Sequence, residues 1–205
     1  MMKTYSAEYI KCKLIDYYLS NDSDIIIGNE IMYGKQKKVV DLLLIINNKL
    51  VAIEIKSDSD NLKRLPAQIE ECNKVFDRVI VASSPLHIEK IRELLVLPVG
   101  LLSIEKDIKK IVSAKVNKKQ KKVEMLYSIS ACYLKGLFPQ YKNLNSDEIR
   151  NKLSMKKKEY IHHLLIDFYR TRLTERFKIF LGDRGEATVV DDIPTLSSFH
   201  IIESS

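Results

Sequence analysis

The apolar positions in the first quarter of the chain predict one amphipathic helix followed by three strands. Apolar residues recur at helical spacing from Tyr5 to Leu19. Strand-like runs follow at 24–33, 38–46 and 49–56, and the middle run is apolar on both faces, as in a strand buried inside a sheet. Because the connections between these runs are short, the three strands should form an antiparallel meander.

The same pattern continues with further strands and helices to residue 104. The segment 66–75 is predicted to be a helix, since proline is accepted in a first helical turn. A strand follows at 78–83, and Ser84-Pro85 has the residues of a cap and first turn that open a helix of about ten residues. A fifth strand is expected at 99–104, so the fold class is α/β.

Longer helical periods begin at Val123 and predict a helical region. We therefore divide the chain into a core over 1–114, a basic linker over 115–122, a helical domain over 123–182 and an acidic tail over 183–205. A helix-turn-helix within the helical domain is disfavoured, because no turn glycine separates the candidate helices.

A two-residue turn sets the register between the second and third strands. Asn47-Asn48 tolerates the positive φ angles that such a turn requires. Ile46 should then pair with Lys49. Counting outward from that pair places Asp41 directly opposite Glu54.

The other hairpin brings a third carboxylate to the same row. If residues 34–37 form a four-residue loop, Tyr33 pairs with Lys38 and Glu30 comes opposite Asp41. Neighbouring Cβ atoms across strands are roughly 4.5–5.5 Å apart, and like charges in such pairs are destabilising. A positive charge is therefore expected among the three carboxylates.

Lys56 supplies one positive charge, and a metal ion is expected to supply more. The two-residue period of a strand puts Lys56 on the same face as Glu54. Carboxylate oxygens are the ligands that suit Mg²⁺ or Mn²⁺. The row therefore predicts a metal-dependent phosphodiesterase site.

The spacing of these residues resembles a known nuclease signature. Val40-Asp41, twelve further residues and then Glu54-Ile55-Lys56 are similar to the PD-(D/E)XK motif, with Val40 in place of the proline that gives the motif its name. The segments 54–68 and 76–81 resemble one group of small predicted bacterial nucleases in that superfamily, whose own pattern is matched by Asp60, Arg64, Leu65 and Gln68. The resemblance covers the chain to about Glu105.

The resemblance implies a restriction-endonuclease-like core of helix, three-stranded antiparallel meander, helix and further strands. It also implies a Mg²⁺- or Mn²⁺-dependent endonuclease, a hydrolase acting on DNA. The metal ligands would be Asp41, Glu54, the backbone carbonyl of Ile55 and, directly or through water, Glu30. Lys56 would orient the attacking water and stabilise charge, and Gln68 would orient that water or a phosphate.

The charge of the chain favours a polyanionic partner. The formal net charge is +7, and lysines gather in the basic linker and again at 156–158. The residues expected to contact nucleic acid are Arg64, Lys118, Lys119, Lys121 and Lys122. After Leu181, five acidic residues against one arginine form a tail that is either solvated or folded back on the basic linker or the DNA-facing surface.

Several classes of protein are excluded by composition. No apolar run is long enough to span a membrane, and the first residues lack the apolar core of a signal peptide, so a cytoplasmic location is expected. The three cysteines are widely spaced and indicate neither a disulfide framework nor a zinc motif. His162 and His163 are adjacent and, on a helix, point too far apart to share a metal. A homo-oligomer is not indicated.

Two alternatives remain open from the sequence. The first is a catalytically inactive protein with the nuclease fold that binds nucleic acid or a protein partner. The second is a regulatory or inhibitory module whose working part is the helical domain. The sequence does not decide between DNA and RNA, the strandedness of the substrate, or one and two metal ions.

Overall fold

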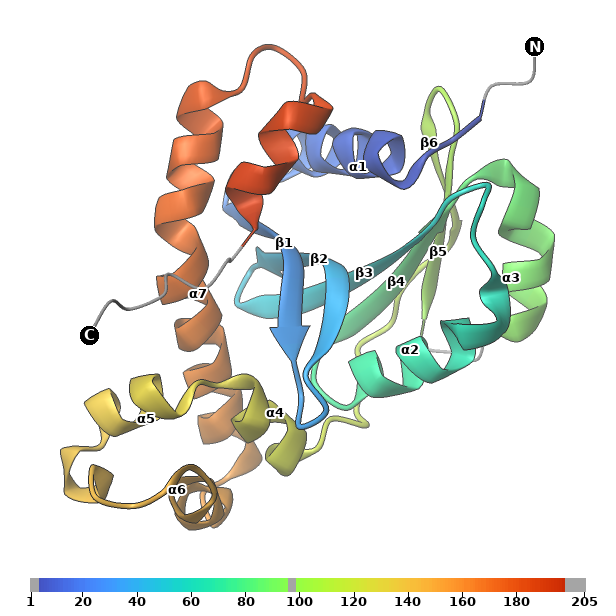
Figure 1. Ribbon diagram of the computed structural model, residues 1–205. Coiled ribbons are helices and arrows are strands. Elements are labelled where there is room, and N and C mark those ends of the chain that lie inside the picture. The colour runs from blue at the N-terminus through green and yellow to red at the C-terminus, as the bar shows by residue number, and fades with distance from the viewer. Residues whose placement is uncertain (1–3, 96–98, 198–205) are drawn as a thin grey trace.

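The fold is built around a six-stranded sheet whose strands lie side by side in chain order. The computed structural model describes residues 4–95 and 99–197 (Figure 1). The first three strands are antiparallel, β3, β4 and β5 are parallel, and β6 returns antiparallel to β5. The strands are β1 (Ile25–Tyr33), β2 (Lys38–Ile46), β3 (Lys49–Lys56), β4 (Arg78–Ser83), β5 (Gly100–Ile104) and β6 (Ile108–Val112). The predicted α/β class is confirmed.

Both predicted hairpin registers are confirmed. Ile46 pairs with Lys49 across the turn, and Tyr33 pairs with Lys38. Asn47 and Asn48 have φ angles of 49° and 55°, which asparagine tolerates better than most residues. The turn chemistry of a few polar residues therefore sets the alignment of three strands.

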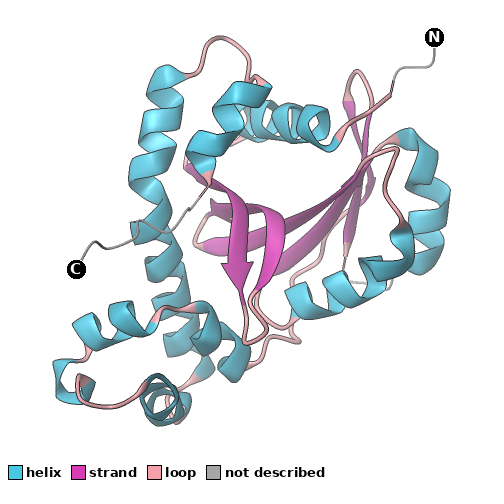
Figure 2. Cartoon of the chain, viewed as in Figure 1, coloured by secondary structure: helices cyan, strands magenta, loops and turns pink. Residues whose placement is uncertain are grey.

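Helices cover both faces of the sheet (Figure 2). One face carries α1 (Ala7–Asn21), and the opposite face carries α2 (Leu65–Asn73) and α3 (Ile88–Leu94). The predicted helix after Ser84 is a single turn, η2 (Pro85–His87), that continues into α3. Another short turn, η1 (Leu62–Arg64), leads into α2.

Strand β6 was not predicted. Its residues are mostly exposed, and Lys109 and Lys110 lie in its middle. Charged residues on an edge strand hinder pairing with other chains, but they also remove the apolar alternation by which a strand is recognised. The sequence pattern of this segment therefore does not predict a strand, and its extended structure depends on pairing with β5.

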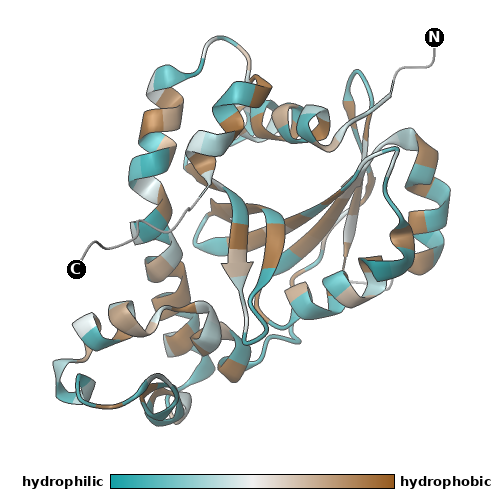
Figure 3. Ribbon diagram, viewed as in Figure 1, coloured by the Kyte–Doolittle hydropathy of each residue, from teal (hydrophilic) through white to brown (hydrophobic). Residues whose placement is uncertain are grey.

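The predicted helical region is present and packs on the sheet. It consists of α4 (Lys122–Ser128), α5 (Ala131–Leu137), the turn η3 (Pro139–Tyr141), α6 (Ser146–Ser154) and α7 (Lys158–Asp183). Asn145 caps α6 in a reciprocal arrangement with Glu148. The buried apolar side chains of this region up to Leu173 belong to the same cluster as those of β2, β3 and α2, whereas Phe177 and Phe180 belong to the cluster on the α1 side. Figure 3 shows hydrophobic and hydrophilic residues alternating along α7. The region thus shares a core with the sheet.

A buried polar cluster around Asp77 joins the linker, the sheet and α7. Its carboxylate accepts hydrogen bonds from the Leu50 N–H at 2.8 Å and the Gln120 amide at 3.2 Å, and it lies 2.8 Å from Nε2 of His162. Burial alone would raise the pKa of Asp77, but the bonds from His162 and Leu50 outweigh it and lower the pKa. His162, which the sequence places at the surface or in the core and not in a metal site, therefore has Asp77 as a specific partner.

The acidic tail folds back, but against α1 and α7. Asp16 on α1 accepts from Arg184 at 2.9 Å and from the Thr188 N–H at 3.0 Å. The turn η4 (Val190–Leu196) then buries Ile193 and Leu196 in the core on the α1 side. Of the alternatives left open by the sequence, a solvated tail or one folded on the basic linker or the DNA-facing surface, residues 183–197 follow neither and pack on α1 and α7, while Glu203 lies outside the described residues.

None of the helices in the described ranges is both long enough and apolar enough to cross a membrane.

Replacing Leu196 with alanine should destabilise the fold, because Leu196 is fully buried on the α1 side. Large-to-small changes at such sites cost about 2–5 kcal/mol. Chemical denaturation measures the change, and Val190→Ala on the same turn is the control, since Val190 is 51% exposed. Equal stabilities of the two variants would show that η4 does not support the core.

Candidate functional site

The site lies where β2 and β3 separate. Their ladder ends at the pair Leu42 and Ile53. Beyond that pair, Oδ2 of Asp41 accepts a hydrogen bond from the Ile55 N–H at 2.7 Å. A side-chain carboxylate therefore takes the place of a backbone acceptor, and the register still aligns Asp41 with Glu54 as predicted.

Glu30 interrupts the neighbouring ladder between β1 and β2. Its φ angle is 53°, and it is the one residue of the strand that is skipped between the paired residues Asn29 and Ile31. Ile27 packs on the α1 side of the sheet, whereas Ile31 packs on the α2 side. In a regular strand these two residues would share a face, so the positive φ reverses the alternation of side chains along β1.

The carboxylate of Glu30 consequently forms an ion pair with a lysine and does not join Asp41 and Glu54. It lies 3.0 Å from the ammonium of Lys11, which α1 brings to this edge of the sheet. The Glu30 side chain is 54% exposed, while that of Lys11 is 10% exposed. The register that brings Glu30 opposite Asp41 is thus present, but its carboxylate is held by a lysine that sequence reasoning missed.

Gln68 joins the carboxylate and the ammonium of β3. Its amide nitrogen donates to Oε2 of Glu54 at 2.8 Å, and its amide oxygen accepts from the Lys56 ammonium at 3.1 Å. Gln68 lies on α2, which faces β3 across this edge of the core. Three residues expected in the site, Glu54, Lys56 and Gln68, are therefore in contact.

A thiol and a phenol complete the buried side of the site. Cys72, one helical turn after Gln68, donates to Oε1 of Glu54 at 3.6 Å, and the Tyr33 hydroxyl lies 3.2 Å from the sulfur. The sequence indicated that the cysteines are buried or incidental thiols, and Cys72 is fully buried, but its contact with Glu54 was not predicted. Its spacing of four residues from Gln68 was a signal that both side chains share one face of α2.

Burial perturbs both carboxylates. It raises the pKa of Glu54 to about 8, with the neighbouring charge of Asp41 adding to the effect and Lys56 opposing it. The pKa of Asp41 is also raised by burial, while the Ile55 N–H, Lys56 and Lys11 oppose the rise. Two adjacent carboxylates with raised pKa values are typical of functional sites.

The loop after β3 is fixed by two aspartates whose carboxylates accept hydrogen bonds from the backbone. Asp60 accepts from the backbone N–H of Ser57 at 2.7 Å and also from its hydroxyl, and these bonds outweigh burial and lower its pKa. Asp58 accepts from the Tyr5 N–H at 2.8 Å. Asp60 thus caps the loop, as the sequence indicated.

Asp41 and Glu54 fit a divalent ion such as Mg²⁺ or Mn²⁺. Both are oxygen donors, and a cation beside them would stabilise their charged forms. Among the described residues, however, no three or more His, Cys, Asp and Glu side chains gather in an arrangement that could hold a metal. The carbonyl of Ile55 stays a predicted ligand, and Glu30 is paired with Lys11.

The residues expected to contact nucleic acid differ in their surroundings: one makes hydrogen bonds within the fold, one is exposed, and three border pockets. Lys122 donates from its ammonium to the carbonyls of Ser154 and Lys156, at 2.5 and 3.2 Å, so it caps the end of α6. Lys118 is exposed. Arg64 borders a pocket of about 340 Å³ that also reaches Gln68, and Lys119 and Lys121 border a second pocket beside α2.

The fold and site together define an α/β protein with a helical C-terminal region and a cluster of four polar side chains, in which Glu54 and Lys56 are buried and Asp41 and Gln68 are half-buried. The chain belongs to the bacteriophage P4 protein cII family, which it matches over residues 1–197. Protein cII of Enterobacteria phage P4 is 26% identical over 206 residues, which span 89% of this chain and 78% of that protein. A solved structure, the SPO1766 protein of unknown function from Silicibacter pomeroyi, has a TM-score of 0.44 and 16% identity, and the match covers 66% of this chain and 89% of that one.

Replacing Glu54 with glutamine should stabilise the protein at high pH more than at low pH. The folded-state pKa of Glu54 is raised from 4.5 to about 8, so its contribution to stability is fully present below pH 4.5 and is lost as the pH rises through 8. Glutamine does not ionise. The melting temperature of Glu54→Gln minus that of the wild type should therefore increase between about pH 5 and pH 9, by on the order of a few degrees.

Glu93→Gln is the matched control, because Glu93 is an exposed carboxylate on α3. Its difference from the wild type should stay flat over the same pH range. A flat difference for Glu54→Gln as well would contradict the raised pKa.

Proposed function

We propose that this protein is a cytoplasmic metal-dependent nuclease of the PD-(D/E)XK type that hydrolyses phosphodiester bonds in DNA. The observation that supports the proposal is the contact of Glu54, Lys56 and Gln68 beside Asp41. The order α1, antiparallel β1 to β3, α2 and parallel β4 agrees with the restriction-endonuclease-like core that the sequence motif implies. Buried charges with no role would be costly to retain in a sheet.

In this proposal the carboxylates of Asp41 and Glu54, with the carbonyl of Ile55, hold Mg²⁺ or Mn²⁺. The bound ion would lower the pKa of a water molecule and neutralise charge at the phosphorus. Asp41 keeps its orientation through the bond from the Ile55 N–H. Glu54 keeps its orientation through the bonds from Gln68 and Cys72.

Lys56 orients the attacking water and stabilises negative charge on the phosphate. Its ammonium is fixed by the oxygen of Gln68, and the same amide donates to Glu54, so one side chain positions both groups. A donor held in place before reaction stabilises developing charge without reorganisation. Gln68 is therefore a positioning residue as well as a candidate contact for the phosphate.

The substrate would approach through the 340 Å³ pocket between α2 and the β1–β2 hairpin. Gln68 belongs to both the site and the lining of this pocket, and Lys38 and Arg64 add two positive charges to it. Among the described residues that line it, the one carboxylate is that of Glu71, which is paired with Lys74. Cations beside a phosphodiesterase site attract the phosphate backbone without regard to sequence. This arrangement supports a nucleic-acid substrate.

One observation favours a second candidate, a protein with this fold that binds nucleic acid without cutting it. Lys11 holds the carboxylate of Glu30, which leaves Asp41 and Glu54 as the converging pair. Lys11 and Lys56 together could balance that pair without a metal. Cleavage assays separate the two candidates.

The purified protein should nick or degrade DNA with Mg²⁺ or Mn²⁺ and be inert in EDTA. Asp41→Ala, Glu54→Ala and Lys56→Ala should each lower the cleavage rate at least about 100-fold, since each removes a group that acts on the reacting atoms. Plasmid, single-stranded, branched and RNA substrates should be compared in the same assay. Rates are read from gel-resolved products.

Lys49→Ala is the matched control, because Lys49 is an exposed lysine on the same strand as Lys56. It should cut at the wild-type rate. Asp41→Ala and Glu54→Ala should keep a melting temperature near that of the wild type, since removing one of two adjacent carboxylates relieves repulsion. Lys56→Ala should melt at a lower temperature, because it removes the cation that opposes the raised pKa of both carboxylates. Absence of metal-dependent cleavage on every substrate would leave the non-cutting protein as the better candidate.

A further inference from the structure

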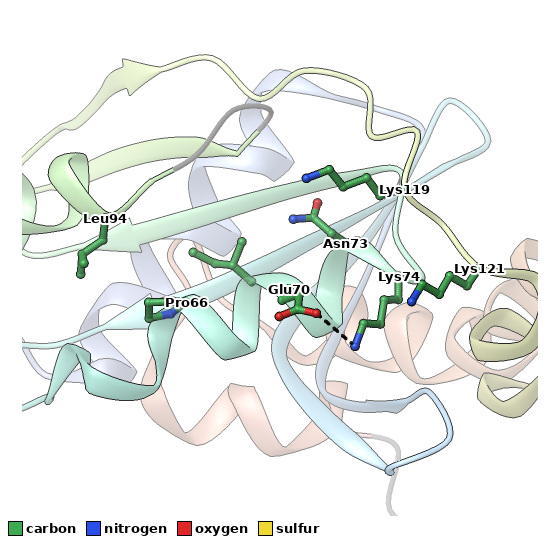
Figure 4. Close-up of a pocket in the computed structure, with 8 residues that line it drawn as sticks. Pro66, Glu70, Asn73, Lys74, Leu94, Lys119 and Lys121 are labelled. Carbon is green, nitrogen blue, oxygen red and sulfur yellow. Dashed lines mark ion pairs between the residues drawn. The ribbon is translucent and has the colours of Figure 1, made fainter.

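A second pocket lies on the side of α2 that faces away from Gln68. Its volume is about 650 Å³, within the range of small-molecule sites. Figure 4 shows that its two ends differ: Pro66 and Leu94 lie at one end, and Lys74, Lys119 and Lys121 lie at the other. Ile69 also lines it, so an apolar platform leads to a cationic end.

The cationic end is built on a fixed backbone. Asn117 is buried, and its side chain donates to the carbonyls of Asn73 and Phe76 at 2.5 and 2.9 Å. The same side chain accepts from the Lys119 N–H at 2.8 Å, and the Lys121 N–H donates to the carbonyl of Lys74 at 2.8 Å. The linker therefore holds both lysines beside α2.

Two of the three lysines retain their charge for a ligand. Lys74 is paired with Glu70 and Glu71, at 3.6 and 2.6 Å. Lys119 and Lys121 make no ion pair with any residue in the described part of the chain. Their charges point to an anionic group such as a phosphate.

Asn73 gives the pocket a specific polar group between its two ends. The residue is 8% exposed, and its side-chain oxygen has no hydrogen-bond partner within the described residues. An unpaired buried acceptor is destabilising, and a ligand that donates an N–H to it would remove that penalty. The amino and imino groups of nucleobases are such donors.

We propose that this pocket binds a nucleoside phosphate. The base lies on Pro66, Ile69 and Leu94, donates to the Asn73 oxygen, and places its phosphate between Lys119 and Lys121. The ligand is either a free nucleotide or the terminal nucleotide of a nucleic acid, which present the same chemistry. The site is separate from Asp41 and Glu54 and does not depend on the proposed nuclease activity.

Calorimetric titration of the full chain in EDTA tests the proposal. The four ribonucleoside and four deoxyribonucleoside monophosphates are compared with adenosine alone and with inorganic phosphate alone. At least one nucleotide should bind about tenfold or more tightly than adenosine alone or inorganic phosphate alone, because the nucleotide contacts both ends of the pocket. Binding no tighter than that of phosphate alone would overturn the assignment.

Three variants assign the contacts. The double variant Lys119→Ala, Lys121→Ala should lose about tenfold or more in affinity for nucleotide and for phosphate. Asn73→Ala should weaken nucleotide binding and leave phosphate binding unchanged. Lys115→Ala, at an exposed linker lysine outside the pocket lining, should have no effect. An equal loss in Lys115→Ala would mean general charge attraction and would contradict the site.

Oligonucleotides distinguish the two sources of the ligand. Single strands with a terminal phosphate are compared with circular single strands of equal length. Preference for ends indicates a terminal nucleotide, and tight binding of mononucleotides indicates a free ligand. Equal binding of circular and linear strands without any mononucleotide binding would overturn the proposal. Lys56→Ala should bind mononucleotides as the wild type does, because Lys56 does not line this pocket, so loss of cleavage and loss of this site are read separately.

Discussion

The placement of two neighbouring carboxylates inside a sheet, the buried Glu54 and the half-buried Asp41, is the constraint on which the rest of the structure depends. Burial removes water from both carboxylates, so each needs hydrogen-bond donors or cations in its place. The backbone ladder between β2 and β3 ends just before these two residues, so the Ile55 N–H is free to donate a hydrogen bond to the Asp41 carboxylate. On α2, the side chains of Gln68 and Cys72 donate hydrogen bonds to the Glu54 carboxylate, and these bonds fix the helix against β3.

The helical region stabilises the edge of the same sheet. A helix laid along β1 protects its unpaired backbone groups from other chains. Contact is close there: a Cβ on Gly28 would lie 2.9 Å from the methyl groups of Leu173 on α7. The Tyr169 hydroxyl donates to the Met32 carbonyl at 3.1 Å, and Arg170 donates to Asn48 at 2.7 Å. The C-terminal half is therefore part of the framework that holds the site.

Sequence patterns predicted a structural feature correctly where that feature depends on interactions between residues close together in the chain. The turn at Asn47 depends on residues within the turn, so its register could be counted and was confirmed. Gln68 was found through a motif, although its bonds to Glu54 and Lys56 bring together residues that are 14 and 12 positions apart, respectively. The edge strand β6 was missed because its stability depends on pairing with β5.

The sequence by itself determined the α/β class, the alignment of the first three strands and the meeting of Glu54 and Lys56 on one face, because turn chemistry and the two-residue period of a strand are local properties. Tertiary structure alone decided that Glu30 pairs with Lys11, since a positive φ angle and a helix packed across the sheet are both needed. It also decided that the tail packs on α1 through Asp16. Where the local sequence pattern is compatible with several interaction partners for a side chain, long-range packing decides which partner it contacts.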